Sequence, residues 1–413
     1  MEILLIGNGF DLAHKLPTQY KDFLEFTKII KQILFANVDV NALDWGNVQT
    51  DIKNIIKEEM GNKRDNLFSQ DKVWKELLEK NLWVNYFLNC SSFVGENWID
   101  FESEISRVIQ IFDEVRQRLT NEESIEDFNK QKSGVILSIL DAAKGNLSDV
   151  ARNTELFDKF LVRMEKELNQ LIRALEIYLV DFVGKISISK KVPEMEGINP
   201  DHILSFNYTD TYKRTYGIEK EIEYDYIHGK AENFNSIETN NMVLGIDEYL
   251  SDDKKDKDFT FLYFKKFYQR ILKATDNDYL DWVDDIKDGY QEYLYKESIA
   301  YTGTVKSFKD GSFNDVPFQK IIRSDMSDIV CPEHTLYIFG HSLDVTDKDI
   351  LKLFICNDNV QTKIFYYRKT EEDKSTLGKL IKNLISIMGQ DELVKRTGGV
   401  NKTIEFIPQT IEE

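Results

Sequence analysis

Short apolar runs recur along the chain, and most of them end at glycine or at a small polar residue. The runs are EILLIG (2–7), HILSFN (202–207), YDYIHG (224–229), TLYIFG (335–340), KIFYY (363–367) and TIEFIP (403–408). Strands of a parallel sheet are buried on both faces, so their sequences are continuously apolar and do not alternate. The pattern predicts an α/β fold with a parallel sheet, and MVLGI (242–246) is a candidate for one more strand.

Between the first two runs, from about Tyr20 to about Gly184, apolar residues follow the spacing of amphipathic helices. The stretch at 155–184 predicts one long helix, and a second helical stretch covers about 259–298. We therefore expect a Rossmann-like core built from residues 1–20, 200–250 and 330–413. Residues 21–195 and 251–330 are expected to form two helical insertions.

Composition limits the classes of partner. The chain has 413 residues, 42% of them apolar, and a formal charge of −19 from 53 basic and 72 acidic residues. So acidic a protein is a poor match for nucleic acid or for an anionic membrane surface, because like charges repel. The three cysteines form no CxxC pair, and no apolar stretch reaches the length of a membrane span. An early glycine turn argues against a signal peptide, so we expect a cytoplasmic location.

Four polar motifs follow predicted strands and mark one edge of the sheet. They are GNGFD (7–11), FNYTD (206–210), IHGK (227–230) and FGHSLD (339–344). Ligands of open parallel sheets bind outside the carboxyl ends of the strands. The sequence therefore predicts a ligand site at this edge.

The first motif is a glycine turn that resembles the start of a dinucleotide-binding loop. Glycine permits close approach of a ligand to backbone N–H groups at the start of a helix. The candidate binding residues of this turn are Gly7, Asn8, Gly9, Phe10 and Asp11. The third glycine of the full fingerprint is replaced by Leu12, so a tight turn without a ligand is the alternative.

The second and third motifs hold candidate catalytic residues. The Asn207 amide is suited to holding a water or a ribose hydroxyl, and Asp210 to acting as a base or orienting a polar group. His228 titrates near neutral pH and is suited to general-base chemistry. The alternatives are an Asx turn with Asp210 as a helix cap, and a structural histidine in the core.

The fourth motif offers further contacts for a nucleotide. Its candidate binding residues are Gly340, His341, Ser342 and Asp344. An acidic residue at such a position binds ribose hydroxyls in dinucleotide sites. A helix start at Thr346, with Asp349 three residues later, is a second interpretation that is compatible with the first.

Other polar clusters carry weaker signals. The acids of ENWIDFESEI (96–105) are interpreted as a solvated helix face in preference to a metal cluster, and Asp247 is a minor candidate for the sheet edge. The basic residues of FKKFYQR (264–270) suit either a phosphate contact or the polar side of a helix. His202 and His334 fall at the opposite strand ends and are interpreted as structural.

Taken together, the motifs resemble the AbiH family of bacterial phage abortive-infection proteins. The resemblance depends on IGNGFDLAHKLPTQYKDFL, NWIDFESEI, ILSFNYTDTY, YIHGK and FGHSLDVTD, in that order. More distantly, the order of glycine turn, Asn-containing strand end, His-Gly and Gly-x-Ser is similar to sirtuin-like NAD-binding domains. That resemblance implies Asn207 and His228 as the catalytic pair. The acid that usually follows the Asn by two residues is Thr209 here, and the sirtuin zinc ribbon is absent.

The resemblances imply an abortive-infection effector that hydrolyses NAD⁺ to nicotinamide and ADP-ribose. NAD is then the substrate, with no further cofactor and no metal. The helical insertions are assigned to sensing a phage-derived trigger, to binding a defence partner or to homo-oligomer assembly. Two alternatives stay open: a nucleotide sensor without catalysis, and a metal-dependent nuclease that uses Asp11, Asp210, Asp247 and Glu102.

Overall fold

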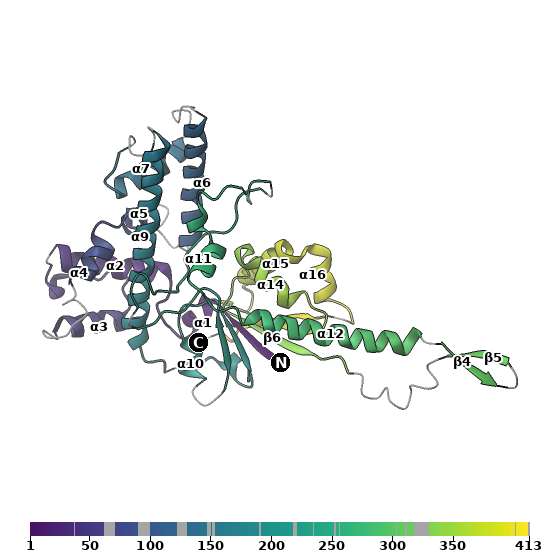
Figure 1. Cartoon of the computed structure of the whole chain (residues 1–413). Helices are drawn as coiled ribbons and strands as arrows, with labels where there is room; N and C mark the ends of the chain where they lie inside the picture. The colour runs from purple at the N-terminus through teal and green to yellow at the C-terminus, as the bar shows by residue number, and fades with distance from the viewer. Residues whose placement is uncertain are drawn as a thin grey trace.

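The structure is a computed structural model with one central sheet and a large helical part beside it (Figure 1). It describes residues 1–36, 38–61, 71–89, 100–121, 130–146, 150, 153–189, 191–217, 221–233, 235–251, 253–255, 257–302, 304–309, 312–317, 330–400 and 402–411. Residues 96–99 of the ENWIDFESEI motif lie outside the described residues.

Six parallel strands form the central sheet, and they correspond to the six apolar runs of the sequence. They are β1 (Glu2–Ile6), β2 (His202–Ser205), β3 (Glu223–Tyr226), β6 (His334–Phe339), β7 (Val360–Tyr366) and β8 (Ile404–Pro408). Their order is β3-β2-β1-β6-β7-β8, and all five pairings are parallel. The predicted α/β fold with a parallel sheet is confirmed. The prediction of a strand at 242–246 is wrong, because this segment forms only one isolated bridge, between Ile246 and Lys265.

Alternate residues of each strand enter two separate cores. Ile3 and Leu5 of β1 pack with α12 (Tyr279–Thr302), α14 (Lys348–Ile355) and α15 (Ser375–Met388). Leu4 and Ile6 face the other side, where α1 (Asn8–Ala13) and α10 (Thr211–Thr215) lie. Burial on both faces explains why the strands are continuously apolar. The last helix, α16 (Gln390–Thr397), precedes β8.

The first helical insertion (residues 21–195) forms a third core of its own. Its helices are α2 (Tyr20–Phe35), α3 (Thr50–Gly61), α4 (Asp71–Trp74), α5 (Leu82–Asn89), α6 (Phe101–Thr120), α7 (Lys130–Ala142) and α9 (Thr154–Asp181). The long helix expected at 155–184 is confirmed as α9, which ends at Asp181 before a short 3-10 turn. In Figure 1 these helices stand to one side of the sheet.

The second helical insertion (residues 251–330) contains α11 (Lys266–Leu272), α12 and an antiparallel hairpin. The hairpin strands are β4 (Thr304–Lys309) and β5 (Ser312–Pro317), which the sequence pattern does not predict. In Figure 1, α12 extends away from the sheet and the hairpin lies at its far end. The division of the chain into a core and two insertions stays a prediction.

Candidate functional site

The strand register places the four motifs side by side at the carboxyl edge of the sheet. Ile6 pairs with both Ser205 and Phe339, and Ser205 pairs with Tyr226, so four neighbouring strands end at the same level. Counted within the sheet alone, the strand order is 3-2-1-4-5-6, which is the order of dinucleotide-binding folds. In such sheets the ligand crevice lies where the order reverses, and here that point falls between β1 and β6.

The glycine turn after β1 packs against the turn after β6, backbone to backbone. A Cβ added to Gly7 would lie 2.7 Å from the His341 Cα, and one added to Gly9 would lie 2.7 Å from the Gly340 Cα. The N–H of Gly7 donates to the Phe339 carbonyl at 3.1 Å, and that of Gly9 to the Gly340 carbonyl at 2.8 Å. Close packing between the two turns is thus one physical reason for these glycines. Phosphate binding by the turn stays a prediction, and it would need N–H groups other than these two.

Gly340 is a glycine at which both backbone conformation and lack of space oppose a side chain. Its φ is +71°, and a Cβ would overlap the backbone nitrogen of Phe10. We expect Gly340→Ala to lower the free energy of unfolding by about 2–4 kcal/mol, because both strain and overlap with rigid backbone oppose the side chain. Gly378→Ala, in α15 with no atom near the added Cβ, is the matched control and should be neutral or stabilise by up to about 1 kcal/mol. Urea unfolding curves measure both, and equal midpoints for the two variants would contradict the expectation.

The Asn207 amide connects the ends of β2 and β1. Its Nδ2 donates to the Gly7 carbonyl at 3.0 Å, and the residue is buried. Asp11 is also buried, and its Oδ2 accepts a hydrogen bond from the Thr209 hydroxyl at 2.7 Å. Burial raises the pKa of Asp11 to about 6, although Thr209 and neighbouring groups oppose the rise. The Phe10 ring is fully buried among aromatic residues, so any contact of Phe10 with a ligand would come from its backbone.

His228 faces a carboxylate that the sequence did not single out. Its Nε2 lies 3.6 Å from Oδ1 of Asp347, and the His341 Nε2 lies 3.4 Å from Oδ2 of the same carboxylate. The His341 Nδ1 accepts a hydrogen bond from the Leu343 N–H at 2.9 Å, so in the neutral ring the proton is on Nε2 and points toward Asp347. Leu343 itself has a φ of +55°, an uncommon backbone conformation for a branched residue.

The two nitrogens of His228 have different surroundings. Nε2 faces Asp347, whereas Nδ1 is buried and has no hydrogen-bond partner in the part of the chain that the structure describes. Burial lowers the pKa of His228 below its ordinary value, with Asp347 opposing the change, so the ring is neutral at neutral pH. An unpartnered buried nitrogen is costly, and a catalytic role or a bound water is the usual reason for one.

Both helical insertions supply a charged group to the same place. Lys266 begins α11, and its ammonium lies 2.7 Å from Oε2 of Glu102 on α6 and 3.7 Å from Oδ1 of Asp347. Burial raises the pKa of Glu102 to about 7. Burial alone would also raise the pKa of Asp347, but Lys266 and the two imidazoles outweigh it and hold that pKa well below its ordinary range. Two neighbouring carboxyl groups with divergent pKa values are typical of acid–base sites.

The expectation of a solvated acidic face at 100–104 is wrong. The Asp100 carboxylate caps α6, and Glu104 is buried and contacts Tyr86 and Arg107. Glu102 is bound to Lys266, as described above. Of the basic residues of 264–270, Lys265 pairs instead with Glu248 at 2.7 Å. Burial raises the pKa of Asp247 to about 6, although the charge of Lys266 opposes the rise.

The remaining predicted site residues lie at the edges of the motifs. Asp344 caps the 3-10 helix η9 (Val345–Asp347) by accepting from the Thr346 N–H at 3.1 Å, so the predicted cap at Thr346 is wrong. Asp210 occupies the N-cap position of α10 without a side-chain cap bond. Ser342 is exposed, and its carbonyl accepts from Asn383 at 3.0 Å. The Asn8 Oδ1 accepts from the Thr18 hydroxyl at 2.6 Å.

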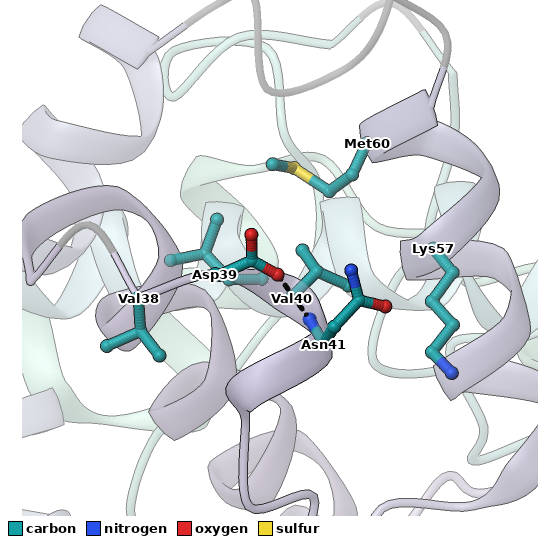
Figure 2. Close-up of a pocket in the computed structure, with 7 residues that line it drawn as sticks. Val38, Asp39, Val40, Asn41, Lys57 and Met60 are labelled. Atoms are coloured by element: carbon teal, nitrogen blue, oxygen red, sulfur yellow. Dashed lines mark hydrogen bonds between the residues drawn. The ribbon is translucent and has the colours of Figure 1, made fainter.

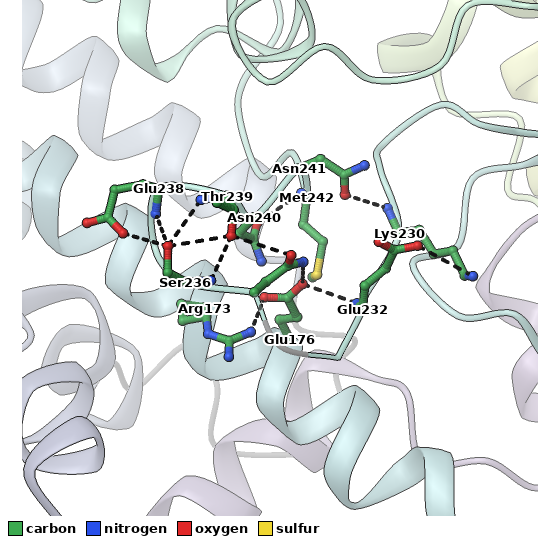
Figure 3. A network of polar contacts seen from close by, with 11 residues as sticks. Arg173, Glu176, Lys230, Glu232, Ser236, Glu238, Thr239, Asn240, Asn241 and Met242 are labelled. Atoms are coloured by element: carbon green, nitrogen blue, oxygen red, sulfur yellow. Dashed lines mark hydrogen bonds and ion pairs between the residues drawn. The ribbon is translucent and has the colours of Figure 1, made fainter. Parts of the chain in front are cut away.

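The loop that follows His228 is fastened to the first helical insertion. Gly229 has a φ of +75°, and the Lys230 N–H donates to Oδ1 of Asn241 at 3.0 Å. Figure 3 shows this loop meeting Glu176 of α9, which accepts hydrogen bonds from Asn235. Through Glu176, the first helical insertion therefore holds the loop that follows His228.

A surface pocket of about 520 Å³ lies elsewhere, within the first helical insertion (Figure 2). It is lined by residues of 33–41 and of α3, and it contains none of the predicted site residues. In the described ranges, no three His, Cys, Asp or Glu side chains are grouped so that they would hold a metal ion. Each helix in those ranges is too short or too polar to span a bilayer.

Comparison with known proteins gives one match. The family model described as bacteriophage abortive infection AbiH matches residues 3–367, which include β1 to β7 and both helical insertions. No curated protein and no solved structure matches the chain. The match covers most of the chain and supports a role in abortive infection by phage. The chain belongs to the AbiH family of bacteriophage abortive infection proteins.

Proposed function

We propose that this protein is an NAD⁺ glycohydrolase that acts during phage infection. The observation that carries the proposal is the pairing of His228 with Asp347, because it leaves Nδ1 of His228 as a lone-pair nitrogen without a partner among the described residues. A carboxylate that orients a neutral histidine is the usual arrangement of a general base. The strand order of a dinucleotide-binding fold adds support for a nucleotide substrate.

The reaction replaces the bond between C1′ of the ribose and nicotinamide by a bond to water. The C1′–N bond breaks first, and its electron pair leaves with nicotinamide as a neutral molecule. Water then adds to the positively charged ribose, and its proton moves to Nδ1 of His228 and on to solvent. The products are nicotinamide, ADP-ribose and one proton, so atoms and charge balance without an oxidant or a metal.

Other residues of the edge have roles that follow from their positions. The buried carboxyl group of Asp11 is suited to binding ribose hydroxyls or to stabilising the cationic ribose when it is ionised. Asn207 holds the end of β2 against Gly7 and so sets the spacing at which water and ribose would bind. The distant resemblance to sirtuin-like domains agrees with this choice of Asn207 and His228 as the central pair.

Membership in the AbiH family supports a role in phage abortive infection. Loss of NAD⁺ in the cytoplasm would stop an infected cell before phage are released. We assign the recognition of a phage-derived trigger, or of a defence partner, to the helical insertions, and assembly into a homo-oligomer is a second task for them. Both insertions supply residues at the candidate site, so a trigger that binds an insertion could change the position of these residues directly.

The test is incubation of the purified protein with NAD⁺, with and without phage lysate. We expect nicotinamide and ADP-ribose in equal amounts, and no effect of a chelator. Binding of NAD⁺ or ADP-ribose without turnover in either condition would replace the enzyme by a nucleotide sensor. Chelator-sensitive cleavage of nucleic acid, with NAD⁺ intact, would replace it by a nuclease.

A further inference from the structure

We propose that Lys266 is a positioning residue for the His228–Asp347 pair and that Glu102 holds Lys266 in place, so that both helical insertions are part of the site. This inference rests on the proposed function for its effect on turnover. It depends on geometry that neither the family match nor the sequence motifs indicate, because Glu102 and Lys266 are separated by more than half of the first insertion and by two strands.

The key feature is a shared oxygen atom. The Lys266 ammonium lies 3.7 Å from Oδ1 of Asp347, and Nε2 of His228 lies 3.6 Å from the same oxygen. Two cations at one oxygen repel each other, so the permanent charge of Lys266 opposes protonation of His228. Glu102, at 2.7 Å, binds the other side of the ammonium and offsets part of its charge.

Among the described residues, few charged groups surround His228. The titratable or charged groups that face it come from α11 and from the segment after β6, and they are Lys266, Arg270, His341 and Asp347. The carboxyl groups that face Lys266 are Glu102, Asp347 and Asp247. Lys266 is thus a single ammonium among three carboxyl groups, and its side chain is only 9% exposed.

Substitutions of Lys266 and Glu102 are expected to differ in their effect on His228. Lys266→Met removes the cation that competes with protonated His228, so His228 becomes easier to protonate and the acid limb of the pH–rate profile moves up by about one pH unit. Because burial raises the pKa of Glu102 to about 7, this carboxyl group is largely protonated where His228 titrates, so Glu102→Gln should move the acid limb much less than Lys266→Met does. Lys266→Arg keeps the charge and should restore the wild-type limb.

The measurement has two readouts. The first is the pH dependence of kcat/KM for NAD⁺ hydrolysis. The second readout needs no turnover and is the NMR titration of the histidine Cε1–H signals. The chain has only 5 histidines. The signal of His228 is assigned by its loss in His228→Ala. Lys265→Met and Glu248→Gln are the matched controls, because this neighbouring pair of a buried lysine and an exposed glutamate, 2.7 Å apart, forms no ion pair with Asp347.

The outcomes separate the two proposals. An upward shift of the His228 titration in Lys266→Met, reversed in Lys266→Arg and absent in the Lys265→Met and Glu248→Gln controls, supports the inference even where the wild type does not hydrolyse NAD⁺. In that case only the proposed function fails. An unshifted His228 titration in a folded Lys266→Met variant overturns the inference, and if that variant does not fold, the same result in Lys266→Gln overturns it.

Discussion

Replacing His228 by alanine is expected to lower kcat for NAD⁺ hydrolysis by about 10²- to 10⁴-fold, the usual contribution of a general base. The proton of the attacking water then has no acceptor, since Nδ1 is the ring nitrogen that does not face Asp347. KM should change little, because His228 acts on water and not on the parts of NAD⁺ that supply binding energy.

Asp347→Asn should produce a loss of similar size by a different route. An asparagine amide has a single acceptor oxygen, so it cannot accept hydrogen bonds from both His228 and His341 as the two carboxylate oxygens do. It also leaves the Lys266 ammonium with one ionic partner fewer. The orientation of the His228 ring is then lost, while the ring itself is present. Initial rates of nicotinamide release measure both variants.

The matched control is a histidine at the opposite end of the sheet. His202 begins β2 and contacts Asp201 and Glu223, so His202→Ala should keep the wild-type rate. If His228→Ala hydrolyses NAD⁺ as fast as His202→Ala does, His228 is not the base. Thermal unfolding of all three variants shows whether a lower rate reflects a loss of fold.

The sheet could be predicted from the sequence because its strands are buried on both faces. Each apolar run, such as ILLI of β1, is long enough to cross the core and ends at a residue that breaks the strand. The segment 242–246 is equally apolar, yet it forms no strand. Met242, Leu244 and Ile246 are buried in the core of the first helical insertion. Tertiary packing therefore determines the backbone conformation of this segment, and its local β-strand preference does not.

The candidate site was only partly predictable for a different reason. The strand ends fix where Gly7, Asn207 and His228 lie, and the sheet brings them together. Glu102 and Lys266 lie on two separate helices, and charged residues of helices are normally solvated. Only the packing of α6 beside α11 makes them partners, and no spacing along the chain records that contact.

The role of Asp347 could not be predicted even though the residue lies inside a recognised motif. It lies inside the FGHSLDVTD motif, and the pattern there indicated a helix start. The structure does place a short helix at this point, but Asp344 provides the cap and Asp347 turns toward the two histidines. A helix cap and a charged site can use residues of the same short motif. The sequence alone does not show that Asp344 is the cap and that Asp347 faces the histidines.

The second large effect is expected at Glu176 of α9, where the loop after His228 is fastened (Figure 3). Its side chain is fully buried, forms an ion pair with Arg173, and accepts from Asn235 Nδ2 at 2.6 Å and from the Glu232 N–H at 3.2 Å. Glu176→Ala leaves the largely buried guanidinium and two donors without their acceptor. We expect the free energy of unfolding to fall by about 3–5 kcal/mol, as for other buried pairs that lose one partner.

The loss of the Glu176 contacts should also affect the candidate site, because the loop continues from His228. Glu232 and Asn235 lie between His228 and Val243, whose N–H donates to the His228 carbonyl at 2.8 Å. Release of the loop from α9 should therefore lower NAD⁺ turnover in the molecules that stay folded, because His228 loses its fixed position relative to Asp347. Glu155→Ala is the control on the same helix: its pair with Lys159 is exposed, and its loss should change neither stability nor turnover measurably. Urea unfolding and initial rates, measured on both variants, test the expectation. If Glu176→Ala is as stable and as active as Glu155→Ala, α9 does not fix the position of the loop that follows His228.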